Sequence, residues 1–201
     1  MRNRAATITA PLLPYLSTAI GASEATLIEM TSAYTAFASQ GVRMAPLPIL
    51  EVTNREGNML EQHRPEPHEA LRADTSYLMT SLLEGVILHG TGATAATQKL
   101  RALGWPLGGK TGTTDDFTDA WFIGFDPDIT VGVWVGHDQK KPIGGGNMTG
   151  AVAALPIWVD IMTAWVDRKR HESGELPVFT RPGNVVIVDG EAYIAGTEPG
   201  R

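Results

Sequence analysis

The chain has 201 residues, with 22 acidic and 16 basic side chains and a formal charge of −6 at neutral pH. This acidic balance lacks the basic footprint of nucleic-acid-binding proteins. The absence of cysteine excludes disulfides, cysteine-ligated zinc, iron–sulfur clusters and thiol nucleophiles. Because the 22 glycines and 13 prolines follow no fixed period, collagen-like and low-complexity classes are also excluded. The length suits one domain with a small appendage.

The N-terminus and the longest apolar run bear on membrane association. Two arginines lie within the first four residues, but no apolar stretch follows them, so we expect no signal peptide in this chain. The most hydrophobic run, residues 151–166, contains Pro156 and Asp160 and is too short to span a bilayer. We therefore expect it to form a buried core helix, with no membrane contact by this segment.

The first elements in chain order are an irregular lead-in over residues 5–22 and a helix. Ser23 is predicted to cap this helix, which runs to about Ser39. Its apolar residues recur at helical spacing and define one face: Leu27, Met30, Tyr34 and Phe37.

A hairpin, a loop and a second helix follow. Strands at 49–52 and 59–61 flank a turn, and residues 62–69, with two prolines, are predicted to form a loop. Asp74 is predicted to cap the second helix, which ends before the glycines at 90 and 92. The apolar residues of that helix also recur at helical spacing: Leu78, Met79, Leu82, Leu83, Val86 and Ile87.

After a third helical piece over 94–103, the pattern changes from helix to strand. Three strand-like runs, 107–113, 120–125 and 129–135, are joined by short turns. Such spacing predicts an antiparallel meander. The sequence thus indicates a mixed α/β (α+β) fold, with a three-stranded antiparallel sheet packed against helices.

The C-terminal residues differ in character from the rest. Residues 172–201 contain one strand-like run, 185–188, among prolines and glycines. We therefore expect one domain portion over 1–170 and a tail or linker over 171–201.

Residues 104–111 match the phosphate-binding pattern G-x-x-x-x-G-K-T/S. That motif works where a strand precedes the loop and a helix follows it, so that backbone N–H groups surround a phosphate. Here a helix-like segment precedes it, and a polar turn over 112–116 follows. Nucleotide binding is therefore the less favoured interpretation of this segment.

The same lysine fits a second interpretation, in which Lys110, Thr111, Gly112 and Thr113 form a strand. Because side chains alternate along a strand, Thr111 and Thr113 would face the same side. Two hydroxyls beside a lysine suit a carboxylate ligand, and Gly112 permits close approach to the backbone. An edge strand also offers N–H groups to an oxyanion or an extended peptide.

A longer series of segments extends this pattern, namely residues 21–34, 41–43, 77–79, 90–92, 109–114, 119–125 and 131–136. Taken together they resemble the C-terminal part of the transpeptidase domain of bifunctional (class A) penicillin-binding proteins. The resemblance covers about residues 12–165, with a fainter similarity at 182–190. It implies the fold shared by penicillin-binding transpeptidases and serine β-lactamases, here incomplete.

The resemblance also implies a function. Members of this family are serine D,D-transpeptidases, which cross-link peptidoglycan stem peptides ending in D-Ala-D-Ala through an acyl-serine and which bind β-lactams. Lys110 would place positive charge beside the nucleophile. Thr111, Gly112 and Thr113 would bind the substrate, with the two hydroxyls on its carboxylate and the Thr113 N–H in the oxyanion hole. The parent protein would act at the extracytoplasmic (periplasmic) face of a bacterial inner membrane.

The two serine motifs that the family requires, S-x-x-K with the nucleophile and then S-x-N, are not found among these residues. None of the seven serines has a lysine three positions on or an asparagine two positions on: Ser17, Ser23, Ser32, Ser39, Ser76, Ser81 and Ser173. We therefore expect the missing N-terminal part of the same domain to be a partner of this segment, and the 201-residue chain to be inactive alone. The alternative is a non-catalytic module that binds wall peptide or a partner protein.

No cofactor or metal site is predicted. The five histidines are scattered, without the spacing of metal ligands: His63, His68, His89, His137 and His171. Asp115, Asp116 and Asp119 cluster between two strand-like runs, where turn formation accounts for them.

Overall fold

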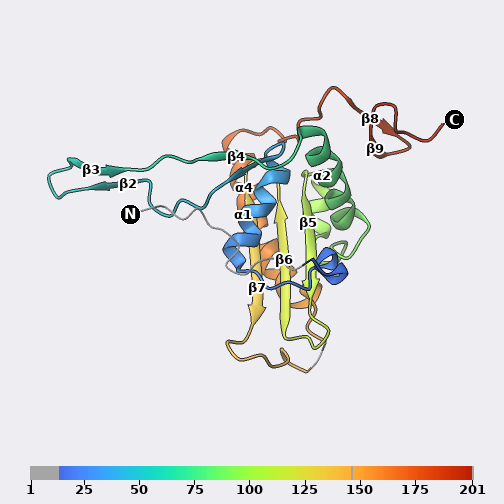
Figure 1. The fold of residues 1–201 in the computed structure, drawn as a ribbon, viewed down its shortest axis with the longest axis horizontal. Coiled ribbons are helices and arrows are strands. Elements are labelled where there is room, and N and C mark those ends of the chain that lie inside the picture. The colour runs from blue at the N-terminus through green and yellow to red at the C-terminus, as the bar shows by residue number, and fades with distance from the viewer. Residues whose placement is uncertain (1–13, 146, 201) are drawn as a thin grey trace.

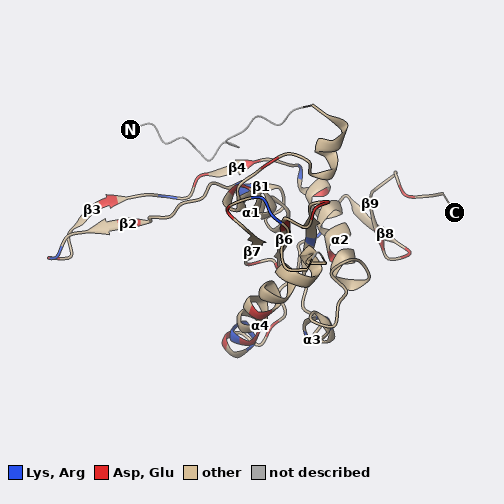
Figure 2. Ribbon diagram, turned by 90° about the horizontal axis from the view of Figure 1, so that it is seen from below, with Lys and Arg blue, Asp and Glu red and all other residues tan. Residues whose placement is uncertain are grey.

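In the computed structural model, residues 14–145 and 147–200 are described. At its centre is a three-stranded antiparallel sheet of β5 (Gly108–Thr113), β6 (Asp119–Phe125) and β7 (Thr130–Gly136), in that order. The predicted meander and the mixed α/β class are confirmed. Helices α1 and α2 lie in front of the sheet and α4 lies behind it (Figure 1). Figure 2 shows the same arrangement from below, with α1 and α4 on opposite sides of the strands.

The rear face of the sheet is covered by one long helical segment. A π-helical turn, Gly150–Ala154, leads directly into α4 (Leu155–Glu172). Trp158, Met162 and Val166 are fully buried, and the Trp158 ring packs 4.9 Å from that of Phe122 in β6. By length and composition alone, residues Gly150–Glu172 could cross a membrane, since an 18-residue stretch within them has a mean hydropathy of 1.3. Burial of their inner face against the sheet accounts for this composition and confirms the predicted core helix.

The front face carries α1 (Leu27–Ala38), which follows a short 3-10 helix, Leu16–Ile20. The predicted cap at Ser23 is wrong, because α1 begins after Thr26. The Thr26 hydroxyl accepts the N–H of Glu29, and the Glu29 carboxylate accepts the N–H of Thr26 at 2.8 Å. This reciprocal capping box outweighs the isolated serine three residues earlier.

Helix α2 (Ala73–Leu88) also begins differently from the prediction. Arg72 is the N-cap residue, and Asp74 lies within the first turn, where its carboxylate accepts from Arg72 and from the N–H of Thr75. Small hydroxyl side chains make the contact with α1: those of Ser76 and Thr80 donate to carbonyls of α1 at 2.9 and 3.0 Å. Leu82, predicted on the apolar face, therefore remains 59% exposed.

Two small sheets lie between α1 and α2 in the chain, and the one formed by residues 51–62 extends away from the central sheet (Figure 1). The predicted hairpin is confirmed as β2 (Glu51–Thr53) paired with β3 (Met59–Gln62). The prediction of a loop throughout residues 62–69 is wrong, because β4 (Pro67–Glu69) pairs with β1 (Val42–Met44). Proline is tolerated at the first position of such an edge strand, since no N–H is needed there.

The third helix is shorter than predicted. Helix α3 covers only Gln98–Ala102, and residues before it form turns. The buried Thr97 hydroxyl donates to the carbonyls of Gly92 and Thr94, at 2.7 and 3.0 Å. Threonine thereby stabilises a turn in place of the helix that the spacing suggested.

The tail packs against the body of the protein. The predicted strand is β8 (Val185–Val188), and it pairs with β9 (Glu191–Ile194), a strand that the sequence pattern did not predict. Asn184 donates to Asp74 of α2 at 2.8 Å, and the ring of Phe179 lies 5.7 Å from that of Phe125. The division of the chain at 170/171 stays a prediction.

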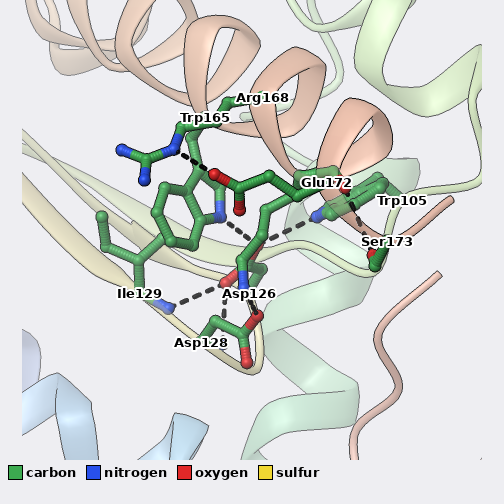
Figure 3. A network of polar contacts seen from close by, with 9 residues as sticks. Trp105, Asp126, Asp128, Ile129, Trp165, Arg168, Glu172 and Ser173 are labelled. Atoms are coloured by element: carbon green, nitrogen blue, oxygen red, sulfur yellow. Dashed lines mark hydrogen bonds and ion pairs between the residues drawn. The ribbon is translucent and has the colours of Figure 1, made fainter. Parts of the chain in front are cut away.

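A buried carboxylate fixes the start of β5 relative to α4 (Figure 3). Asp126, just after β6, accepts from the indole N–H groups of Trp105 and Trp165 at 2.9 and 2.8 Å. Its other oxygen accepts the backbone N–H groups of Asp128 and Ile129, both at 2.8 Å. Because Trp105 precedes β5 and Trp165 lies in α4, this network joins three parts of the core.

Candidate functional site

Strand β5 lies at an edge of the central sheet, and β6 is its one partner among the described strands. The N–H of Thr114 bonds to the carbonyl of Asp119 at 3.2 Å, in register with the ladder. In an antiparallel pair, residues bonded to the partner strand alternate with residues whose backbone groups point away from it. The N–H groups of Thr111 and Thr113 are therefore directed toward the open edge.

Lys110 presents a positive charge at this edge. Its side chain is exposed, and its Nζ donates to the carbonyl of Thr111 at 2.9 Å. No acidic side chain within the described ranges forms an ion pair with it. The ammonium is thus available to a negatively charged ligand or a reacting group.

The two hydroxyls of β5 are each held by a residue from outside the strand. Thr111 and Thr113 pair with Phe122 and Ala120 in the ladder, so they lie on one face, as the alternation predicted. The Thr111 hydroxyl lies 2.9 Å from the Thr91 hydroxyl, and the Thr113 hydroxyl accepts the N–H of Gly150 at 3.0 Å. Both side chains are therefore fixed before any ligand arrives.

Gly150 can take this position because it has no side chain. A Cβ there would lie 2.3 Å from the carbonyl oxygen of Trp121 and 2.7 Å from that of Gly112. The π-helical turn consequently rests directly on the β5–β6 ladder beside the two threonines. No local pattern predicts this contact, since it joins residues 37 positions apart.

The turn after β5 is maintained by its own polar side chains. The Thr114 hydroxyl accepts the N–H groups of Thr118 and Asp119 at 3.0 and 3.1 Å, and Asp119 accepts the indole N–H of Trp134 at 2.9 Å. Asp115 and Asp116 are exposed. In the part of the chain that the structure describes, no group of three His, Asp or Glu residues is placed to hold a metal.

The structure of residues 104–111 does not fit the phosphate-binding interpretation. From Gly108 onward the segment is strand β5, and the turn that follows leads into β6. Without a helix N-terminus after the lysine, the segment lacks the backbone cradle that binds phosphate.

Comparison with known proteins decides the family. Residues 13–163 match the family described as the penicillin binding protein transpeptidase domain. The chain belongs to this family. It is 39% identical over 199 residues to penicillin-binding protein 1A of Aquifex aeolicus, covering 94% of this chain and 27% of the relative. This member of the penicillin-binding transpeptidase family thus spans about a quarter of that relative's length.

Solved structures support the fold assignment. Penicillin-binding protein 1A from Haemophilus influenzae superposes with a TM-score of 0.79 at 24% identity, covering 92% of this chain and 34% of that one. Penicillin-binding protein A from Mycobacterium tuberculosis, described as an imipenem acyl-enzyme complex, superposes with a TM-score of 0.57 at 22% identity, covering 74% and 34%. At these identities the likeness concerns the fold.

Proposed function

We propose that this chain forms one wall of a D,D-transpeptidase active site that cross-links peptidoglycan stem peptides. In that reaction a serine oxygen attacks the carbonyl carbon of the penultimate D-alanine. The peptide C–N bond breaks, the terminal D-alanine leaves, and an amine of a neighbouring stem peptide then displaces the serine. We propose further that the serine belongs to residues outside these 201, because no S-x-x-K lies within them.

The observation that carries the proposal is the open edge of β5. An ammonium with no ion pair among the described residues, two oriented hydroxyls and outward backbone N–H groups lie together there. The hydroxyls of Thr111 and Thr113 would bind the substrate carboxylate, with Gly112 leaving room at the backbone. Lys110 would supply positive charge beside the nucleophile.

The N–H of Thr113 would serve as one donor of the oxyanion hole. Such a donor stabilises the negative charge that develops on the carbonyl oxygen, and losing one costs on the order of 3 kcal/mol in the barrier.

The same groups would accept a β-lactam, whose carboxylate and strained amide resemble the peptide terminus. The Mycobacterium tuberculosis relative is described as an imipenem acyl-enzyme, which supports β-lactam binding by the whole site. The parent protein would then act outside the cytoplasmic membrane, where peptidoglycan is cross-linked.

Intact-mass measurement after incubation with benzylpenicillin tests this proposal. The 201-residue chain should show no covalent adduct, whereas the protein encoded by the complete reading frame should gain one penicilloyl group. Lys110→Ala in the longer protein should slow acylation severely, with the exposed Lys140→Ala as a control for loss of charge. An adduct on the short chain, or unchanged acylation of Lys110→Ala, would contradict the proposal.

A non-catalytic module that binds wall peptide is the second candidate. It is favoured by the open edge strand, which can pair with an extended peptide without any nucleophile. A longer protein that binds a D-Ala-D-Ala peptide but never gains a penicilloyl group would support this candidate.

A further inference from the structure

We propose that Thr91 is a positioning residue that aims the Thr111 hydroxyl at the carboxylate of the bound ligand. Thr91 lies in the loop after α2, outside the strand that carries the proposed binding residues. The inference rests on the proposed function, because it concerns the carboxylate subsite of that same site.

The loop holds Thr91 in a defined place. Gly90 and Gly92, on either side of it, donate to the carbonyls of Gly85 and Val86 in the last turns of α2, both at 3.0 Å. A Cβ at Gly90 would lie 2.9 Å from Val86 Cα, so the loop is packed directly on the helix. The buried Thr97 hydroxyl secures the far side by its bond to the Gly92 carbonyl. These contacts fix the backbone on both sides of Thr91.

Either hydroxyl can donate across the Thr91–Thr111 contact, and a carboxylate bound to Thr111 would select the direction in which Thr91 donates. A threonine hydroxyl has one proton to donate and two lone pairs that accept. If Thr91 donates to Thr111 across their 2.9 Å contact, the Thr111 proton remains available for a carboxylate oxygen.

The hydroxyl of Thr113 also receives a hydrogen bond from outside the strand, and in that bond the donor is known. The N–H of Gly150 can only donate, so the Thr113 hydroxyl accepts that bond and keeps its own proton for a ligand. Thr91 and Gly150 thus perform equivalent tasks from two different elements, each filling a lone pair of one β5 hydroxyl.

Removal of the Thr91 hydroxyl should therefore weaken recognition of a carboxylate in particular. A hydrogen bond of this kind corresponds to about a three- to tenfold change in rate or affinity. In the Thr91→Val variant the Thr111 hydroxyl loses the donor that orients it, while the charge and shape of the site are preserved.

The test compares acylation of the longer protein by benzylpenicillin and by its methyl ester, which lacks the carboxylate. We expect Thr91→Val to lower the ratio of the two acylation rates about three- to tenfold, and Thr91→Ser, which retains the hydroxyl, to restore it. Thr94→Val is the matched control, because the Thr94 hydroxyl in the same loop is buried and has no hydrogen-bond partner among the described residues. A variant that folds poorly slows both reactions equally, so the ratio reports the subsite alone.

The outcomes separate this inference from the proposed function. If Thr111→Val lowers the ratio and Thr91→Val does not, the role of Thr91 is overturned while the carboxylate subsite stands. If Thr111→Val itself leaves the ratio unchanged, the proposed carboxylate subsite fails, and the role of Thr91 fails with it.

Discussion

At the scale of single residues, the fully buried carboxylate of Asp126 constrains the structure. It accepts four hydrogen bonds, two from indole N–H groups and two from backbone N–H groups. A carboxylate has two acceptor oxygens and no donor, so it can satisfy all four. An asparagine amide would instead direct its own N–H groups at two of these donors.

We therefore predict that Asp126→Asn lowers the free energy of unfolding by about 1–3 kcal/mol, because buried donors lose their acceptor. Urea denaturation followed by tryptophan fluorescence would measure the change. Asp128→Asn is the matched control: it removes an ion pair with Lys169 at the surface, where such pairs contribute little. Equal urea midpoints for Asp126→Asn and the unmodified chain would refute the role of this network.

At the scale of elements, a hydrogen bond from Asn184 to Asp74 joins the tail to α2. The pKa of Asp74 is lowered from its ordinary value to about 2. The hydrogen bond from Arg72 contributes most to this shift, and the one from Asn184 contributes next. A carboxyl group with a lowered pKa stabilises the folded state above its unfolded pKa of about 4. That contribution is lost as the pH falls through 4 toward 2, where the carboxylate takes up a proton.

Asp74→Asn should accordingly be less stable than the unmodified chain at pH 7 and should lose less stability on acidification from pH 4 to pH 2.5. Urea midpoints at these three pH values would show it. The substitution should have a smaller effect in an Asn184→Ala background, because one of the two side-chain donors is already absent. If the urea midpoints of the unmodified chain and of Asp74→Asn change in parallel with pH, Asp74 does not couple the tail to α2.

The elements also show where sequence reasoning succeeds. The meander of β5, β6 and β7 and the apolar helix α4 were predictable because alternation and helical spacing are local properties of the sequence. Strands β1, β4 and β9 were missed because each has only three or four residues and none is a run of β-branched residues such as that of β8. The start of α2 was misplaced because Asp74 takes partners that lie two and 110 residues away.

The residues of the candidate site also fall into those that the sequence could identify and those that it could not. Lys110, Thr111, Gly112 and Thr113 could be selected from the sequence, since they form one continuous motif. Thr91 and Gly150 could not be assigned a role, because their contacts with β5 join residues 20 and 37 positions apart.

At the scale of the whole molecule, the site proposed at the charged edge of β5 has no S-x-x-K serine beside it among these 201 residues. The described residues form a packed sheet with helices on both faces, yet the family's serine motifs do not occur among the 201 residues. This chain covers 27% of the Aquifex aeolicus relative. Under the proposed function, the serine motifs would lie in residues of the parent protein outside these 201.

Peptide mapping of the penicillin-labelled parent protein tests this central claim most directly. Our account predicts one penicilloyl group, attached to a serine outside these 201 residues, with acylation that depends on Lys110. A penicilloyl group on any of the seven serines of this chain would contradict it.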